Sequence, residues 1–152
     1  MKDILWQSLR SGTWASLAMI PFGLFFRLLD LRIGHYGKKV ILALFGALPS
    51  PQMQIAVMTE HLLIGWLSAL PLVMLLPWWQ RRTALQPLWL GLGYGAAYYA
   101  LLNAWLLPRL FGDALPWTLG WLTVLPSLLV HLVFGLVVVW TIRTRPVSTP
   151  LR

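Results

Sequence analysis

The residues best suited to chemistry are two histidines within apolar stretches, each followed four positions later by a glycine. The pattern HLxxG occurs at residues 61–65 and again at 131–135. Residues four apart share one face of a helix, so each imidazole lies beside a glycine at which a second backbone can approach closely. Histidine can also exchange a proton near neutral pH. The pattern predicts either hydrogen-bonded helix contacts or a histidine pair that handles protons.

Other polar residues extend this candidate site. Because adjacent residues point to different sides of a helix, Glu60 and His61 cannot both face one partner. The additional polar residues would lie at a similar depth, so they either form one polar cluster or simply extend toward water at the interface. The candidate set is Arg27, Asp30, Glu60, His61, Asn103 and His131.

Most signatures of enzymes are missing from the chain. It contains no HExxH, no GxSxG, no Walker-type loop and no pair of aspartates within an apolar stretch. It also has no cysteine, which excludes thiol catalysis and cysteine-held metals. The sequence therefore favours a protein without enzymatic activity, and we expect neither a metal nor a cofactor.

The composition is that of a membrane protein. Hydrophobic residues make up 59% of the 152 residues and charged residues only 11%, against about 25% charge in ordinary soluble domains; the mean hydropathy is +0.72. The 12 Lys and Arg lie almost entirely in short breaks between apolar stretches, a placement typical of membrane topology and not of nucleic-acid binding. We therefore expect the lipid bilayer, and no nucleic acid, as a partner.

Four stretches are long and apolar enough to cross a bilayer, which takes about 20 residues each. They cover residues 11–29, 56–79, 88–107 and 118–142. The predicted fold class is all-α, with one transmembrane domain over 1–152 built as a bundle of four helices. Because HLxxG recurs in the second and fourth stretches, an alternative description is two tandem helical hairpins of the same orientation.

The connection over residues 30–55 is the least decided part of the chain. Its apolar core, 40–48, is too short to span as a helix, so we predict an outer interfacial or re-entrant segment. Alternatively it begins a fifth span, which would reverse the C-terminus.

Positive charges predict the orientation. Arg81 and Arg82 occupy a tight loop and three arginines follow Ile142 in the tail, as is typical of cytoplasmic segments. The predicted localisation is the inner cell membrane, multi-pass, with the N-terminus and the C-terminus in the cytoplasm.

Small residues predict where helices touch. Gly91 and Gly95 form a GxxxG pattern in the third stretch, and Gly65 and Gly135 close the two histidine motifs. Such residues let backbones approach closely, either inside one chain, in a homo-oligomer or against another membrane protein.

A kinked first helix with a charged outer loop is followed by a Glu-His second helix, a Gly/Ala third helix with the turn LLPRLFGDALPW, and a final VHLVFGLVVVWTIR with a basic tail. This order of features resembles the YagU-like family of small bacterial inner-membrane proteins. The similarity is greatest over residues 91–145. The resemblance implies an inner-membrane location and no particular reaction.

Two functions follow as hypotheses. The first is a small multi-pass membrane protein without catalytic activity that serves as a packing or accessory component. The alternative is a small transporter or proton-conducting protein that uses Glu60, His61 and His131. A water-filled cavity between these three side chains favours the alternative, whereas a dry, closed bundle favours the first.

Overall fold

The computed structural model describes residues 2–31, 33–34, 36–82 and 86–142. Helix dominates this part of the chain and it contains no strand, so the all-α fold class is confirmed. The tail arginines Arg143, Arg145 and Arg152 lie outside the described residues. The elements are α1 (Lys2–Leu28), α2 (Gly37–Phe45), α3 (Ser50–Arg82), α4 (Pro87–Tyr98), the π-helix η1 (Tyr99–Leu106), α5 (Leu107–Leu110), the 3-10 turn η2 (Pro116–Thr118) and α6 (Trp121–Thr141).

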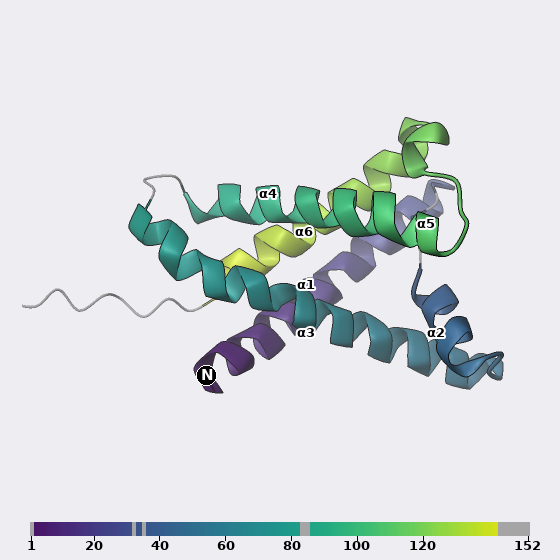
Figure 1. Ribbon diagram of the computed structural model, residues 1–152, viewed down its shortest axis with the longest axis horizontal. Helices are drawn as coiled ribbons and strands as arrows, with labels where there is room; N and C mark the ends of the chain where they lie inside the picture. Colours follow the sequence, from purple (N-terminus) through teal and green to yellow (C-terminus); the bar gives the residue numbers. More distant parts are fainter. Residues whose placement is uncertain (1, 32, 35, 83–85, 143–152) are drawn as a thin grey trace, which may run out of the picture.

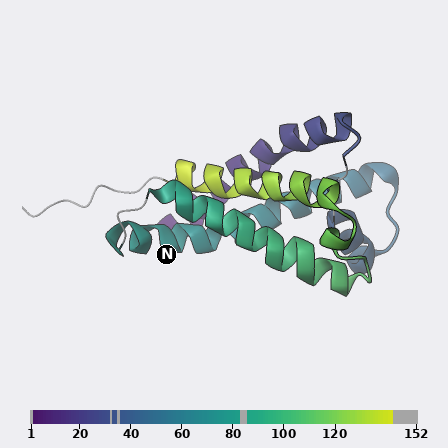
Figure 2. The same ribbon diagram turned by 90° about the horizontal axis from the view of Figure 1, so that it is seen from above.

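Four long helical segments alternate in direction. They are α1, α3, the continuous run from α4 through η1 to α5, and α6. α6 packs against both α1 and α4, and α1 packs against α3. The start of α1, the end of α3 and the end of α6 lie at one end, whereas α2 and the connection from α5 to α6 lie at the other (Figure 1, Figure 2). We call the latter the α2 end.

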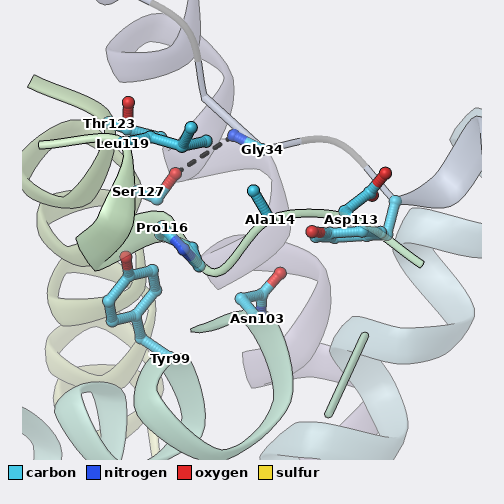
Figure 3. Close-up of a pocket in the computed structure, with 10 residues that line it drawn as sticks. Gly34, Tyr99, Asn103, Asp113, Ala114, Pro116, Leu119, Thr123 and Ser127 are labelled. Carbon is cyan, nitrogen blue, oxygen red and sulfur yellow. Dashed lines mark hydrogen bonds between the residues drawn. The ribbon is translucent and has the colours of Figure 1, made fainter. Parts of the chain in front are cut away.

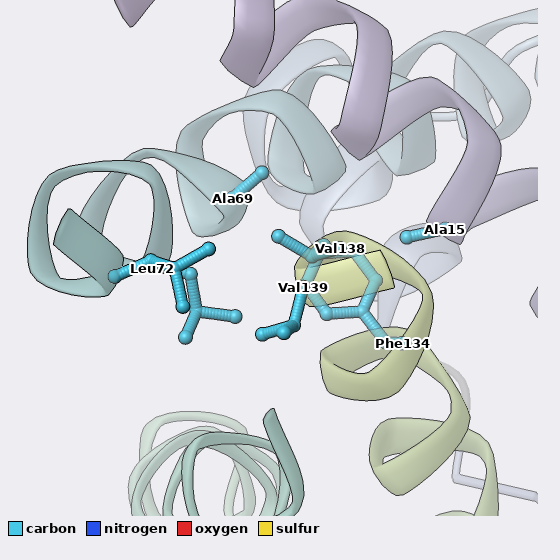
Figure 4. Close-up of a cluster of buried hydrophobic side chains, with 7 residues drawn as sticks. Ala15, Ala69, Leu72, Phe134, Val138 and Val139 are labelled. Atoms are coloured by element: carbon cyan, nitrogen blue, oxygen red, sulfur yellow. The ribbon is translucent and has the colours of Figure 1, made fainter. Parts of the chain in front are cut away.

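The hydrophobic core fills the space where α1, α3 and α6 meet. Small residues of α1 and α3 allow branched and aromatic side chains of α6 to fit between them, as Figure 4 shows. Burial of such apolar surface is the main favourable term in packing helices in water, whereas close van der Waals contact takes over that role in lipid. The core residues are Ala15, Ala69, Leu72, Leu76, Phe134, Val138 and Val139.

α1 and α3 extend beyond the apolar stretches that predict them, whereas α6 begins and ends inside the predicted stretch 118–142. α1 begins at Lys2 and not near residue 11, and α3 spans Ser50–Arg82 and not 56–79. Hydropathy marks only the apolar part of a helix, whereas the backbone hydrogen bonds continue into polar flanks. The start of α4 is clear in the sequence because Pro87 fits the first helical turn, where its missing N–H leaves no bond unmade.

The connection over residues 30–55, whose structure the sequence left open, contains the separate short helix α2. α2 has nine residues, which correspond to about 14 Å of helix length. It ends at Phe45, and the following Gly46, with a φ of 74°, breaks the helical path before α3 begins at Ser50. α2 packs against α3 and is not part of a long helix.

A π-helical turn shapes the third long segment. η1 lies just before Pro108, which has no backbone N–H to continue the regular ladder and whose ring would crowd the preceding turn. π-turns widen a helix and change which side chains share a face. Here the widened turn carries Tyr99 and Asn103, the two residues of this segment that line the cavity described below.

Two of the long helices meet the length and hydropathy expected of a membrane span. These are α3 and α6. The exterior is also apolar, with Leu67 70% exposed, Trp121 75% and Trp140 81%.

Candidate functional site

The glycines of α4 and α6 lie at a backbone contact between these helices. A Cβ atom at Gly91 would lie 2.7 Å from the carbonyl oxygen of Gly135, and one at Gly95 would overlap the carbonyl oxygen of His131. Gly135 in turn faces the backbone of Gly91. The structure therefore places these three predicted packing residues at a contact inside the chain.

The same arrangement recurs between α1 and α3. A Cβ atom at Gly12 would lie 2.6 Å from the carbonyl oxygen of Gly65, and one at Gly65 would overlap the side chain of Ser16. The ring of His61 lies beside this crossing, with Nε2 3.3 Å from the carbonyl oxygen of Ser16. Each HLxxG glycine thus marks a helix crossing. The partners Gly12 and Ser16 were not predicted, although their four-residue spacing can be seen in the sequence.

His131 is a buried, fully hydrogen-bonded ring. Its Nδ1 lies 2.6 Å from the carbonyl oxygen of Ser127 and its Nε2 lies 2.9 Å from Nδ2 of Asn103. Because a carbonyl oxygen can only accept, Nδ1 carries the proton and Nε2 accepts from the Asn103 amide. Of the candidate set, Asn103 and His131 are thus in direct contact.

Tyrosine rings surround this pair. Tyr98 stacks on His131 with ring centroids 5.6 Å apart, and Tyr99 approaches the same ring at 5.7 Å. The hydroxyl of Tyr98 accepts a hydrogen bond from Ser68 at 3.0 Å, which connects α4 to α3. The rings therefore hold His131 in place from two sides.

Glu60 and His61 contact different neighbours. The Glu60 carboxylate lies under the first residue of α2, where a Cβ atom at Gly37 would lie only 2.6 Å from Oε2. A carboxylate is favoured at a helix N-terminus because the exposed N–H groups and the helix dipole are positive there. Glu60 is thus suited to holding α2 against α3, whereas His61 faces α1.

Arg27 and Asp30 are not part of this cluster. Both side chains are exposed, and Asp30 lies in the turn that closes α1, with a φ of 56°. Aspartate is one of the few residues that tolerate this left-handed backbone conformation. The structure accordingly separates these two residues from Asn103 and His131.

A cavity of about 240 Å³ opens above Asn103 at the α2 end (Figure 3). It lies between the α1–α2 connection, η1 and the start of α6. The hydroxyl of Tyr99 points toward Pro116 and Ser127 in this region; it is buried and has no hydrogen-bond partner among the described residues. The lining residues are Gly34, Tyr36, Tyr99, Asn103, Asp113, Ala114, Pro116, Leu119, Thr123 and Ser127.

An ion pair borders the cavity. Nζ of Lys39 lies 2.5 Å from both carboxylate oxygens of Asp113, and the rings of Tyr36 and Phe111 stack beside it with centroids 5.8 Å apart. Burial raises the pKa of the Tyr36 hydroxyl above its ordinary value, and the charge of Asp113 and a hydrogen bond to it raise the pKa further. Tyr36 therefore stays neutral at physiological pH and remains a hydrogen-bond donor.

Of the candidate set, only Asn103 lines the cavity, with His131 directly behind it. Two further lining residues, Tyr36 and Asp113, were not predicted from the sequence. One signal in the sequence could have indicated this wall of the cavity. Lys39 and Asp113 have opposite charges, and both lie in connections expected at one end of the bundle. Within the described residues, no three His, Asp or Glu side chains are grouped to hold a metal ion.

Comparison with known proteins adds no relative. No family model matches the chain, and neither does any curated protein or solved structure. The similarity to the YagU-like family consequently stays a prediction.

Proposed function

We propose that this chain is a multi-pass membrane protein of the transporter type, whose four long helices cross the bilayer and whose cavity at the α2 end binds a small polar solute from the outer side. The apolar exterior and the two span-like helices support the membrane location. The alternating directions of the helices are compatible with four crossings. Arg81 and Arg82, at the opposite end from the cavity, favour a cytoplasmic position for that end.

The hydroxyl of Tyr99, which has no hydrogen-bond partner among the described residues, carries the proposal of a solute site. A buried hydroxyl without a hydrogen bond is unfavourable, by roughly 1–3 kcal/mol, and a solute in the cavity would supply the missing partner. Asn103 uses its amide group on His131, which leaves its carbonyl oxygen to accept from a solute. Polar groups that converge on one cavity are the usual arrangement of a small-molecule site.

The glycine contacts bear on the packing hypothesis. Gly65, Gly91, Gly95 and Gly135 all face other helices of the same chain. They are therefore occupied within the monomer and do not supply a surface for a second protein. This favours solute binding over a role as a packing component.

Cysteine labelling in the membrane tests the proposed cavity. Thr123 and Leu125 lie two residues apart on α6, but Thr123 lines the cavity and Leu125 is exposed on the bundle surface. We expect Thr123→Cys to react with a water-soluble maleimide at least about ten times faster than Leu125→Cys, because the reactive thiolate is disfavoured in apolar surroundings. The chain has no other cysteine to interfere.

The outcome is decided by the ratio of the two rates. Both variants should first show the wild-type unfolding temperature in detergent, so that access and not unfolding is compared. Equal rates for Thr123→Cys and Leu125→Cys, or no reaction at Thr123→Cys, would contradict a water-accessible cavity.

A further inference from the structure

The charge of the cavity limits what it can bind. Among the described residues that line the cavity, only Asp113 has a charged side chain. Its counterion, Lys39, reaches it from α2 and does not line the cavity. A solute that enters the cavity therefore meets a carboxylate, together with hydroxyl and amide groups that can accept hydrogen bonds.

The surroundings of Lys39 show how an ammonium group is held at this wall. Nζ lies 2.5 Å from the Asp113 carboxylate and 5.8 Å from the ring centroids of Tyr36 and Phe111. Cations are attracted to aromatic rings at distances up to about 6 Å. One carboxylate and two aromatic rings thus form an ammonium site that the chain fills with its own lysine.

We propose that the cavity binds a small protonated primary amine, which replaces the ammonium of Lys39 beside Asp113. This inference rests on the proposed solute site. The incoming ammonium would keep the Asp113 carboxylate paired, while its alkyl part would extend into the cavity toward Asn103.

The exchange requires little disruption. The side chains of Lys39 and Asp113 are 42% and 33% exposed, and ion pairs that are open to solvent contribute little net stability. A released Lys39 can extend into water. Asp113 thus keeps a cationic partner before and after the exchange.

The size of the cavity suits a short alkylamine. Engineered cavities of about 150 Å³ admit benzene, so a cavity of about 240 Å³ has room for an ammonium with a short alkyl chain. A carboxylate solute would be repelled by Asp113. A neutral amide would lose the ionic contact.

Protection of the Thr123→Cys variant from maleimide measures binding to the full chain. The probes are n-butylammonium, butanamide and butyrate, which share one chain length and differ in charge. We expect n-butylammonium to protect at a concentration at least about tenfold lower than butanamide, because charge-assisted hydrogen bonds are about twice as strong as neutral ones, and butyrate to give no protection.

Substitutions at the Lys39–Asp113 ion pair distinguish amine binding from the binding of any small solute. Lys39→Ala removes the tethered competitor, whose effective concentration is of the millimolar order, and should lower the protecting concentration of n-butylammonium. Asp113→Asn should abolish the preference for the amine. Lys38→Ala is the matched control, because Lys38 is an exposed neighbour on α2 that does not line the cavity, and it should change neither value.

Each result supports or overturns a distinct claim. Protection by butanamide as strong as that by n-butylammonium would overturn the amine proposal while leaving the solute site intact. An unchanged preference in Asp113→Asn would also overturn it. If Thr123→Cys does not react at all, the cavity itself is wrong, and the amine proposal fails with it. A wild-type unfolding temperature for Lys39→Ala and Asp113→Asn excludes misfolding as the cause.

Discussion

Replacing Gly95 by leucine should lower the free energy of unfolding in detergent by at least about 3 kcal/mol, the upper part of the range for overpacking. A side chain at Gly95 would overlap the backbone carbonyl of His131. Backbone atoms in a helix cannot rotate away as a side chain can, so α4 and α6 must separate. Separation would also pull Asn103 away from His131 and open the floor of the cavity.

A glycine two positions away provides the control for Gly95. A Cβ atom at Gly93 would have no heavy atom within 4 Å. Gly93→Leu should therefore leave the unfolding midpoint near that of the wild type. If Gly95→Leu and Gly93→Leu have the same unfolding midpoint, α4 and α6 do not contact each other through the face that carries Gly95.

The second large effect is expected at Gly12, on the other helix pair. A Cβ atom here would lie 2.6 Å from the carbonyl oxygen of Gly65 and 2.9 Å from Cα of Trp66, which are both backbone atoms. Gly12→Leu should thus separate α1 from α3 and lower the free energy of unfolding by about 3 kcal/mol. Chemical denaturation in detergent with a fluorescence readout measures this change.

Gly23 on the same helix is the matched control for Gly12. A Cβ atom at Gly23 would meet only the side-chain Cδ1 of Ile33, at 3.9 Å, which is an ordinary contact. Gly23→Leu should therefore be close to neutral. A larger loss of stability for Gly23→Leu than for Gly12→Leu would contradict the crossing of α1 and α3 at Gly65.

Hydropathy and small-residue spacing predicted the main helices well. The four apolar stretches correspond to α1, α3, the segment from α4 to α5, and α6, although the helices extend further at several ends. The spacing of Gly91 and Gly95 indicated a contact face. Which helix meets that face depends on the whole bundle, so the sequence alone did not pair it with Gly135.

The cavity was harder to predict for physical reasons. Its lining comes from the α1–α2 connection, the π-helix η1, the connection from α5 to α6 and the start of α6, and no local pattern brings these parts together. Glu60 and His61 were expected in the candidate site because ionisable residues in apolar helices are often functional. The structure instead directs Glu60 to Gly37 of α2 and His61 to Ser16 of α1, where each contacts a neighbouring element.

Sidedness of the two ends tests the central claim, that the bundle crosses the membrane with the cavity end outside. Ala114, at the cavity, and Gln86, just before α4, are both exposed and lie at opposite ends. In intact cells, a membrane-impermeant maleimide should label Ala114→Cys and should label Gln86→Cys only after permeabilisation. Labelling of both positions from the same side, or of Gln86→Cys alone in intact cells, would contradict this arrangement.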